Sequence, residues 1–434
     1  MEKIKKLLKN KLVHNAGWLI GGKIANKLLA FLVGLLTARY LGPGNYGLIN
    51  YATAYTTFFA SLCTLGINSI IVKNFVDHPE ETGETIGTTL VLRTISSILS
   101  VIMIVGIVSM IDRNEPVTIV VAALCSLGLI FQVFDTLNYW FQSRLQSKYS
   151  ALATLVAYIA VSAYKLVLLV TGKSVEWFAV STSVDYVVVA VFLLFAYKKQ
   201  GGPKFSCSKR KAKELLRSSS SFIVSGLMVS IYASTDKLML KQMLDETSVG
   251  HYSLASSVSV MWTFVLSAII DSAFPSIMKL HNENREKYIL RNKQLYAIVF
   301  YAAVFASGAI CIAADPLIRI LYGEAYMPSS AALKIVVWYT AFSYLGIARN
   351  AWIVCEEKQK YLKYIYIGSA LLNVFLNALL IPNWGICGAA AASLITQIST
   401  IFVFPMIIAP LRENTKLIFE AILLQDILTK IRKE

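Results

Sequence analysis

Residues 12–38 read LVHNAGWLIGGKIANKLLAFLVGLLTA, an apolar run with two lysines, Lys23 and Lys27, near its middle. A hydrocarbon core of about 30 Å takes about 20 helical residues to cross, so this run is long enough for one membrane-spanning helix. The two lysines are four residues apart and therefore lie on one face of such a helix. A lysine at the bilayer centre costs about 2.5–3.5 kcal/mol on insertion scales, so neither is expected to face lipid. The run predicts a membrane helix that presents positive charge to the protein interior.

Similar apolar runs follow along the whole chain of 434 residues, of which 56% are hydrophobic and 15% charged. These values lie outside the range of soluble globular proteins. We predict an all-α polytopic membrane protein with about twelve transmembrane helices in two pseudo-symmetric six-helix bundles around a central cationic cavity. The expected spans are 12–38, 46–72, 86–111, 117–141, 150–171, 175–197, 218–241, 250–275, 294–314, 331–354, 361–382 and 386–408.

The formal net charge of +16 is distributed unevenly over the connectors between these spans. Most of the Lys and Arg residues fall in alternate connectors, above all in residues 198–217. Positive residues concentrate on the cytoplasmic side of membrane proteins, so both termini are expected to be cytoplasmic. Basic residues in short membrane connectors do not form a stripe for nucleic acid, and no nucleic-acid partner is expected.

Residues 201–217 are expected to join two halves of the molecule. The sequence YGLINYA at 46–52 is echoed by VGHYSLA at 249–255, and an even number of spans in each half makes these parallel repeats, a plan found in many secondary transporters. We predict a first bundle at 1–200, a basic cytoplasmic connector at 201–217 and a second bundle at 218–408. Residues 409–434 have the spacing of a cytoplasmic amphipathic helix, expected at the membrane interface.

The buried lysines are the first candidates for a binding site. Lys23 and Lys27 can line a water-filled cavity and hold a phosphate or pyrophosphate. The alternative is that they pair with acids such as Asp135 or Asp185.

Two arginines extend this candidate diphosphate site. Arg93 and Arg349 lie in the inner thirds of the third and tenth expected spans, and a guanidinium binds a pyrophosphate in bidentate fashion. The alternative for each is snorkelling to the inner headgroups.

Asp236, Asn373, Asn377 and Thr396 form a candidate cation site in the second half. All four fall between the middle of the membrane and its outer third. One carboxylate with neutral oxygens suits Na⁺, which prefers hard ligands and little net charge. Hydrogen bonding between helices is the alternative, with Asp236 paired to a neighbouring lysine.

Four aromatic residues, Tyr51, Tyr55, Trp262 and Trp338, are candidates for stacking on sugar rings, with packing as the alternative. The six cysteines are scattered and the four histidines form no cluster, so neither a metal site nor a disulfide framework is expected. No motif of a hydrolase, zinc protease or phosphate-binding loop is present, and no catalytic residue is assigned.

Residues 37–47, TARYLGPGNYG, carry a resemblance to a known family. They are similar to the opening of polysaccharide biosynthesis proteins of the oligosaccharide flippase (Wzx) type, within the multidrug/oligosaccharidyl-lipid/polysaccharide exporter superfamily. The span count, the basic connector and residues 225–255 fit the same pattern, so the resemblance covers nearly the whole chain.

The resemblance implies a V-shaped pair of bundles that moves undecaprenyl-diphosphate-linked oligosaccharide from the inner to the outer leaflet of the bacterial cytoplasmic membrane. Transport would proceed by alternating access and serve the synthesis of surface polysaccharide such as O-antigen, capsule or exopolysaccharide. Lys23 and Lys27 match cavity cations in the first helix of the related lipid II flippases, and Asp236, Asn373, Asn377 and Thr396 resemble a sodium site there.

Departures from the lipid II flippases favour the oligosaccharide branch. Asn377 stands where an acid is expected, and Tyr51 and Tyr55 stand where a further cavity cation is sought. The two additional C-terminal helices of lipid II flippases are missing. Na⁺ or H⁺ is the expected coupling ion, without another cofactor.

The expected partners are undecaprenyl-diphosphate-oligosaccharide and membrane lipids, with a polysaccharide polymerase and glycosyltransferases acting on the same glycan. The first rival function is a cation-coupled multidrug exporter of the same superfamily, which is disfavoured because cationic drugs call for buried acids and the first half presents lysines. The second is a membrane enzyme acting on lipid-linked sugars. The longest external connector, 315–330, has few residues fit for catalysis, so the protein is not expected to be an enzyme.

Overall fold

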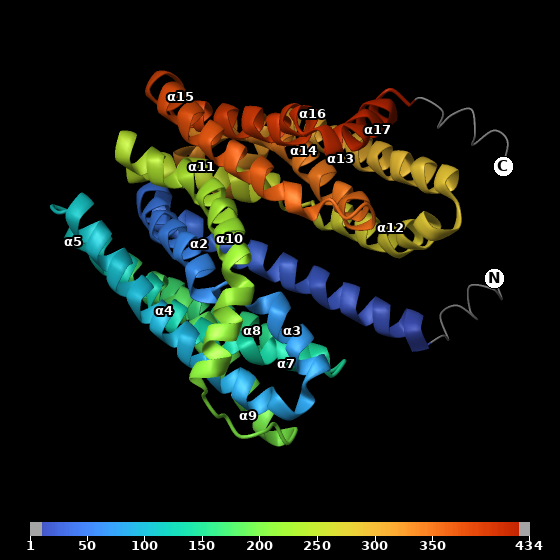
Figure 1. Cartoon of the computed structure of the whole chain (residues 1–434). Helices are drawn as coiled ribbons and strands as arrows, with labels where there is room; N and C mark the ends of the chain where they lie inside the picture. Colours follow the sequence, from blue (N-terminus) through green and yellow to red (C-terminus); the bar gives the residue numbers. More distant parts are fainter. Residues whose placement is uncertain (1–10, 425–434) are drawn as a thin grey trace. The chain divides into compact units, whose positions relative to one another are not determined.

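The computed structural model describes residues 11–424, with side chains from residue 29 onward except at 69, 221, 222, 224 and 225. Within these residues the chain is a succession of helices without strands (Figure 1). Lys23 and Lys27 lie in helical backbone, but their side chains are outside the described set.

Helices of the first half of the chain are α2 (Lys11–Thr64), α3 (Asn68–Asp77), η1 (Pro79–Glu81), α4 (Thr82–Ile111), α5 (Pro116–Ser126), α6 (Gly128–Gln132), η2 (Val133–Asp135), α7 (Thr136–Ser143), α8 (Lys148–Thr171) and α9 (Val175–Lys199). Those of the second half are α10 (Lys209–Met243), α11 (Glu246–Ser259), α12 (Phe264–Glu283), α13 (Arg285–Tyr322), η3 (Glu324–Tyr326), α14 (Pro328–Cys355), η4 (Gln359–Tyr361), α15 (Leu362–Ile398), η5 (Ser399–Val403), α16 (Phe404–Ile407), η6 (Ala409–Leu411) and α17 (Arg412–Ile422).

Eight helical segments of the described residues are long and apolar enough to cross a membrane. One of them, Gln359–Ile407, has 49 residues and kinks at Gly385, where φ is 56°. That length suffices for two crossings. The prediction of an all-α polytopic membrane protein is confirmed, whereas the count of twelve crossings stays a prediction.

One backbone break falls in an expected connector, and others fall inside expected spans. The expected connector after residue 38 is helical, and α2 is interrupted only at Gly42, which has φ 68° and precedes Pro43. Glycine adopts a left-handed φ without strain, and proline has no N–H to continue the helical ladder. The expected span 46–72 is broken at Leu65 and Gly66, both with positive φ. The expected span 250–275 is likewise divided, between α11 and α12, whereas the expected span 117–141 falls within one apolar helical segment, Pro116–Ser143.

By packing, the chain divides into two compact units. The first contains 63–220 with the chain up to residue 41, and the second contains 42–62 with the chain from residue 221. Each unit has its own apolar core, around Trp140 and Phe141 in the first and around Trp352 and Tyr288 in the second. The second part of α2 therefore packs with the C-terminal half of the chain, while the predicted domain boundaries at 201–217 and 409 stay predictions.

The two echoed sequence segments meet inside the second unit. A Cβ added at Gly47 would lie 1.7 Å from the Glu246 carbonyl oxygen and 2.7 Å from the Gly250 nitrogen. A Cβ added at Gly250 would lie 2.0 Å from the Pro43 carbonyl oxygen. Small residues allow such close backbone approach between helices. The glycine of each repeat is thus the contact point for the other.

Helix α17 forms within the segment predicted to be amphipathic, and it lies beside α13 (Figure 1). Its apolar residues Leu417, Ile418 and Ala421 belong to the core of the second unit. Glu420 pairs with Lys293 at 2.7 Å. The apolar face predicted to enter the membrane interface therefore packs on protein, and residues 425–434 of the predicted tail lie outside the described set.

The basic connector is held against the start of α4. The Ser206 N–H donates to the Gly83 carbonyl at 3.1 Å, and the Ser208 N–H donates to Thr88 Oγ1 at 3.1 Å. A Cβ added at Gly87 would lie 2.1 Å from the Ser206 carbonyl oxygen. The connector can follow this path only because α4 has glycines there.

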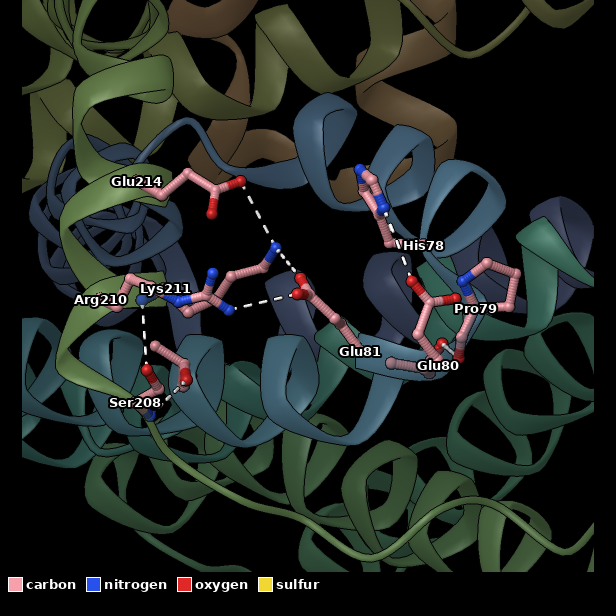
Figure 2. Close-up of polar contacts among 10 residues, drawn as sticks. His78, Pro79, Glu80, Glu81, Ser208, Arg210, Lys211 and Glu214 are labelled. Atoms are coloured by element: carbon pink, nitrogen blue, oxygen red, sulfur yellow. Dashed lines mark hydrogen bonds and ion pairs between the residues drawn. The ribbon is translucent and has the colours of Figure 1, made fainter.

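An ion-pair cluster fixes the end of the connector (Figure 2). Lys211 Nζ lies 2.6 Å from Glu81 and 3.4 Å from Glu214, and Arg210 lies 3.2 Å from Glu81. Burial alone would lower the pKa of Lys211, but the hydrogen bonds to Glu81 and Glu214 raise this pKa above its ordinary value. These pairs tie the first turns of α10 to η1 within the first unit.

Gly87→Ala is expected to destabilise the protein by about 1–3 kcal/mol because the new methyl group collides with connector backbone. Thermal unfolding of the purified protein, with limited proteolysis of residues 199–217, measures the change. Gly106→Ala is the matched control, since Gly106 lies in the same helix with no atom within 4 Å of the added Cβ. Equal stability and equal cleavage of the two variants would contradict this contact.

Candidate functional site

A cavity of about 530 Å³ lies within the second unit. Helices α10, α11, α14 and α15 and the turn η5 form its wall. Half of the lining residues carry a hydroxyl group: Tyr232, Tyr252, Ser253, Ser256, Ser257, Ser259, Tyr339, Ser343, Tyr366, Ser369, Ser393 and Thr400. Its volume is that of a typical small-molecule site. The wall can donate and accept hydrogen bonds at many points, as each hydroxyl does both.

Asp236 of α10 is buried in this wall and is held by neutral groups. Asn377 Nδ2 and Asn373 Nδ2 donate to its Oδ1 at 2.7 and 3.2 Å. The hydroxyls of Tyr252 and Ser393 donate to its Oδ2. The structure thus brings together three of the four residues predicted for the cation site.

Thr396, the fourth predicted residue, is fully buried and lies three residues after Ser393 on the same face of α15. Its hydroxyl and the Asn377 Oδ1 oxygen have no hydrogen-bond partner. Buried polar atoms are nearly always satisfied, so the unsatisfied Asn377 oxygen, on a residue that contacts Asp236, indicates room for a cation or a proton donor. Among the described residues no three or more His, Cys, Asp and Glu side chains gather as a metal site.

Sequence reasoning missed Tyr252 and Ser393 as partners of Asp236. Their positions in the sequence could have indicated them, because Tyr252 falls in the second echoed segment and Ser393 is one helical turn before Thr396. The neighbouring lysines have other partners. Lys237 donates to Asn50 at 3.3 Å and Lys241 pairs with Glu246 at 3.0 Å.

Arg349 is 3% exposed and lines the same cavity. One terminal nitrogen donates to the Thr400 carbonyl at 3.3 Å, and the Nε–H has no partner. In the described part of the chain no carboxylate pairs with this guanidinium. Its burial excludes snorkelling to lipid headgroups. Because no described carboxylate pairs with it, Arg349 is an uncompensated positive charge in the cavity wall.

Arg93 has a different environment, in the first unit. It is 1% exposed and donates to Thr136 Oγ1 at 3.0 Å. Asp135 is close enough to act on it electrostatically, as Asp185 does on Lys165. Arg93 therefore has an acid close enough to act on it, whereas no acid among the described residues acts on Arg349.

The four predicted sugar-stacking residues do not line the cavity. Tyr51 and Tyr55 are buried with their rings edge to face at 5.2 Å, and Gln242 donates to the Tyr51 hydroxyl at 2.7 Å. Trp262 packs on a small apolar cluster and Trp338 is half-buried. The cavity instead receives Tyr232, Tyr339 and Tyr366, a set that hydropathy cannot identify because it does not fix the rotation of each helix.

Solved structures with the same fold include one titled "Lipid II flippase MurJ, inward closed conformation", with a TM-score of 0.70 and 13% identity, covering 93% of this chain and 89% of that one. Another is an inward-facing multidrug resistance MATE family transporter of the MOP superfamily, with a TM-score of 0.67 and 16% identity, covering 89% and 96%. Both support two helical bundles in this chain.

Curated relatives include the "Probable flippase AglR" of Haloferax volcanii, 21% identical over 89% of this chain and 81% of that protein. The "Putative O-antigen transporter" of Escherichia coli K12 is 20% identical over 86% of this chain and 91% of that protein. The names are those of flippases and transporters rather than enzymes, and they confirm the resemblance seen in the sequence.

The family described as "Polysaccharide biosynthesis protein" matches residues 12–281. Residues 12–281 are more than half of the 434 residues. The protein therefore belongs to that family of membrane transporters.

Proposed function

We propose that this protein is a flippase for undecaprenyl-diphosphate-linked oligosaccharide, which it moves from the inner to the outer leaflet of the bacterial cytoplasmic membrane by alternating access. The observation that carries the proposal is the cavity of the second unit, with its hydroxyl-rich wall and its uncompensated Arg349. Sugars present neighbouring hydroxyls that both donate and accept, and this wall matches that chemistry.

A cationic drug fits this wall poorly. A drug exporter requires a free buried acid, but Asp236 already accepts four hydrogen bonds and Arg349 adds a positive charge. Like charges disfavour binding in a low-dielectric cavity. The multidrug exporter therefore remains the second candidate.

The diphosphate is assigned to Lys23 and Lys27, with Arg93 and Arg349 as further cations. Two lysines one helical turn apart place two ammonium groups side by side, which suits an anion with two or more charges. The polyprenyl chain would stay in lipid while the sugars cross in a polar environment. This arrangement requires no catalytic group.

Asp236 is assigned to the coupling ion, Na⁺ or H⁺. A half-turn of the Asn373 or Asn377 amide would replace a donor nitrogen by an oxygen beside the Asp236 carboxylate. With the Thr396 hydroxyl, such oxygens are hard ligands of low total charge. A gradient of either ion can then bias the two end states of the transport cycle.

The proposal places the chain in the bacterial cytoplasmic membrane with both termini in the cytoplasm. Glycosyltransferases would build the lipid-linked glycan on that side, and a polymerase would consume it on the other. The product would be a surface polysaccharide such as O-antigen, capsule or exopolysaccharide.

The double variant Lys23→Ala, Lys27→Ala is expected to lose at least about 90% of the transfer rate, since removing two charge-assisted contacts of about 1.5–3 kcal/mol each weakens substrate binding strongly. Proteoliposomes containing undecaprenyl-diphosphate-oligosaccharide measure this through access of an external sugar-modifying enzyme.

Lys73→Ala serves as the matched lysine control, because Lys73 is an exposed residue of α3, and it is expected to transfer at the wild-type rate. Wild-type transfer by the double variant would remove the lysines from the site. Absence of transfer for several glycans, together with gradient-driven efflux of a cationic dye, would favour the drug exporter.

A further inference from the structure

The charged residues that line the cavity of the second unit do not balance. Among the residues whose side chains the structure describes, its wall contains three of them, Asp236, Lys237 and Arg349. Asp236 and Lys237 are neighbours in sequence and act on each other electrostatically, so their charges offset. Arg349 remains, and the wall has one net positive charge.

A buried guanidinium without a counter-charge is unfavourable unless an anion completes the site. Arg349 is 3% exposed, and its one hydrogen bond to another described residue is to the Thr400 carbonyl. The unpartnered Nε–H is one of the donors that a guanidinium uses when it binds a carboxylate side-on. The described residues thus provide the cation of an ion pair and leave the anion to a ligand.

The surroundings of Arg349 indicate what carries the missing charge. Tyr366 is close enough to Arg349 to act on it electrostatically, and Tyr339 and Ser343 line the cavity from the same helix as Arg349. The buried Ser253 hydroxyl has no partner. Hydroxyls and tyrosine rings thus line the cavity that Arg349 also lines, as expected for a sugar ring that needs hydrogen bonds at its edge and a flat surface on its face.

The number of negative charges on the ligand decides whether a carboxylate or a diphosphate fits this wall. A diphosphate carries two or more negative charges and would leave excess charge in a wall whose net charge is +1. A single carboxylate neutralises that wall. The cavity of about 530 Å³ also has space for a sugar ring around this group.

We propose that the cavity of the second unit is a specificity site for one acidic sugar of the transported glycan, with Arg349 binding the sugar carboxylate. This inference rests on the proposed flippase function and gives its substrate class, a glycan with a uronate-type residue. It separates Arg349 from the diphosphate site and leaves that site to the first half of the chain.

The first test compares ligands on the unaltered full-length protein in detergent. Methyl glucuronide is expected to stabilise the protein against heat at a concentration at least about tenfold lower than methyl glucoside, as a charge-assisted contact is stronger than a neutral one. The methyl ester of methyl glucuronide, which lacks the charge, is expected to behave like the glucoside. Equal effects of acid and ester, or no effect of the acid, would overturn the proposal.

Variants then assign the preference to Arg349. Arg349→Gln is expected to abolish the preference for the acid, and Arg349→Lys to keep part of it. Arg319→Gln is the control, because Arg319 is an exposed arginine of the same unit paired with Glu324. Inorganic pyrophosphate is the third ligand, and stronger stabilisation by pyrophosphate that depends on Arg349 would return this residue to the diphosphate site. If Arg349→Gln does not fold, the comparison of acid and ester on the wild type decides.

Transfer assays keep this proposal separate from the flippase proposal. Faster transfer of an acidic than of a neutral lipid-linked glycan is expected, and the difference should vanish in Arg349→Gln. Equal transfer of both would overturn the acidic-sugar site and leave the flippase function intact. Binding of the glucuronide without transfer of any lipid-linked glycan would leave the site intact and overturn the flippase function.

Discussion

Asp236→Asn is expected to reduce ion-driven transfer by about 30-fold or more. The carboxylate is the only acid that lines the cavity of the second unit among residues 29–424 with described side chains, and four neutral donors orient it. Its replacement removes the charge that attracts a cation while the shape of the site changes little. Loss of one charge-assisted interaction corresponds to about 2 kcal/mol, which is the stated factor. Proteoliposome transfer with and without a Na⁺ or pH gradient measures the effect.

The variant should also lose any stabilisation of the protein by Na⁺ in a thermal-unfolding experiment, a result that a merely structural Asp236 would not give. Asp245→Asn is the matched control. Asp245 caps α11 by accepting from the Ser248 N–H, and asparagine caps as well as aspartate does. A gradient response retained in full by Asp236→Asn would exclude Asp236 as the coupling site.

The residues around Asp236 show how far sequence can predict a site. Asn373 and Asn377 were predicted because their spacing of four puts both amides on one helical face, and the structure directs both at Asp236. Tyr252 and Ser393 were not predicted, because Tyr252 lies on α11 and Ser393 lies on α15 beyond the kink at Gly385, away from the Asn373 and Asn377 pair. Spacing within one helix is contained in the sequence, whereas the rotation of one helix against another depends on packing.

The fold, like the site, could be predicted from the sequence only in part. Long apolar runs gave the helical membrane class, since crossing length depends on composition alone. The break at Gly42 lies in the connector expected between residues 38 and 46, whereas the turn at Leu65 and Gly66 was missed because it lies inside an apolar run. The docking of α17 was also missed, as an amphipathic pattern does not reveal whether its apolar face meets lipid or protein.

Arg93 and Arg349 illustrate the limit for charged residues. Sequence assigned them similar depth and a shared role, but in the structure Arg93 has Asp135 beside it and Arg349 has no acid partner among the described residues. Whether a buried cation is compensated depends on which acid another helix brings close. That pairing separates a structural arginine from a candidate ligand-binding arginine.

Gly47→Ala is expected to destabilise the second unit by about 3 kcal/mol, at the upper end of the usual range for overpacking. The added methyl group would lie 1.7 Å from the Glu246 carbonyl oxygen, which belongs to backbone and cannot move without moving α11. The two helices would have to separate, and Tyr252, which lies on α11 after Glu246, would shift away from Asp236. Thermal unfolding and the yield of monodisperse protein measure the loss, and transfer should fall with it.

Gly44→Ala is the matched control for this prediction, because Gly44 lies one turn earlier on α2 and an added Cβ would meet only the Thr247 hydroxyl, at an ordinary 3.6 Å. Gly250→Ala is expected to resemble Gly47→Ala, as its methyl group would lie 2.0 Å from the Pro43 carbonyl oxygen. Once either methyl group has separated the helices, the second adds little, so the double variant should be less destabilised than the sum of the single variants. Full additivity, or a Gly47→Ala protein as stable as Gly44→Ala, would show that the echoed glycines do not share one contact.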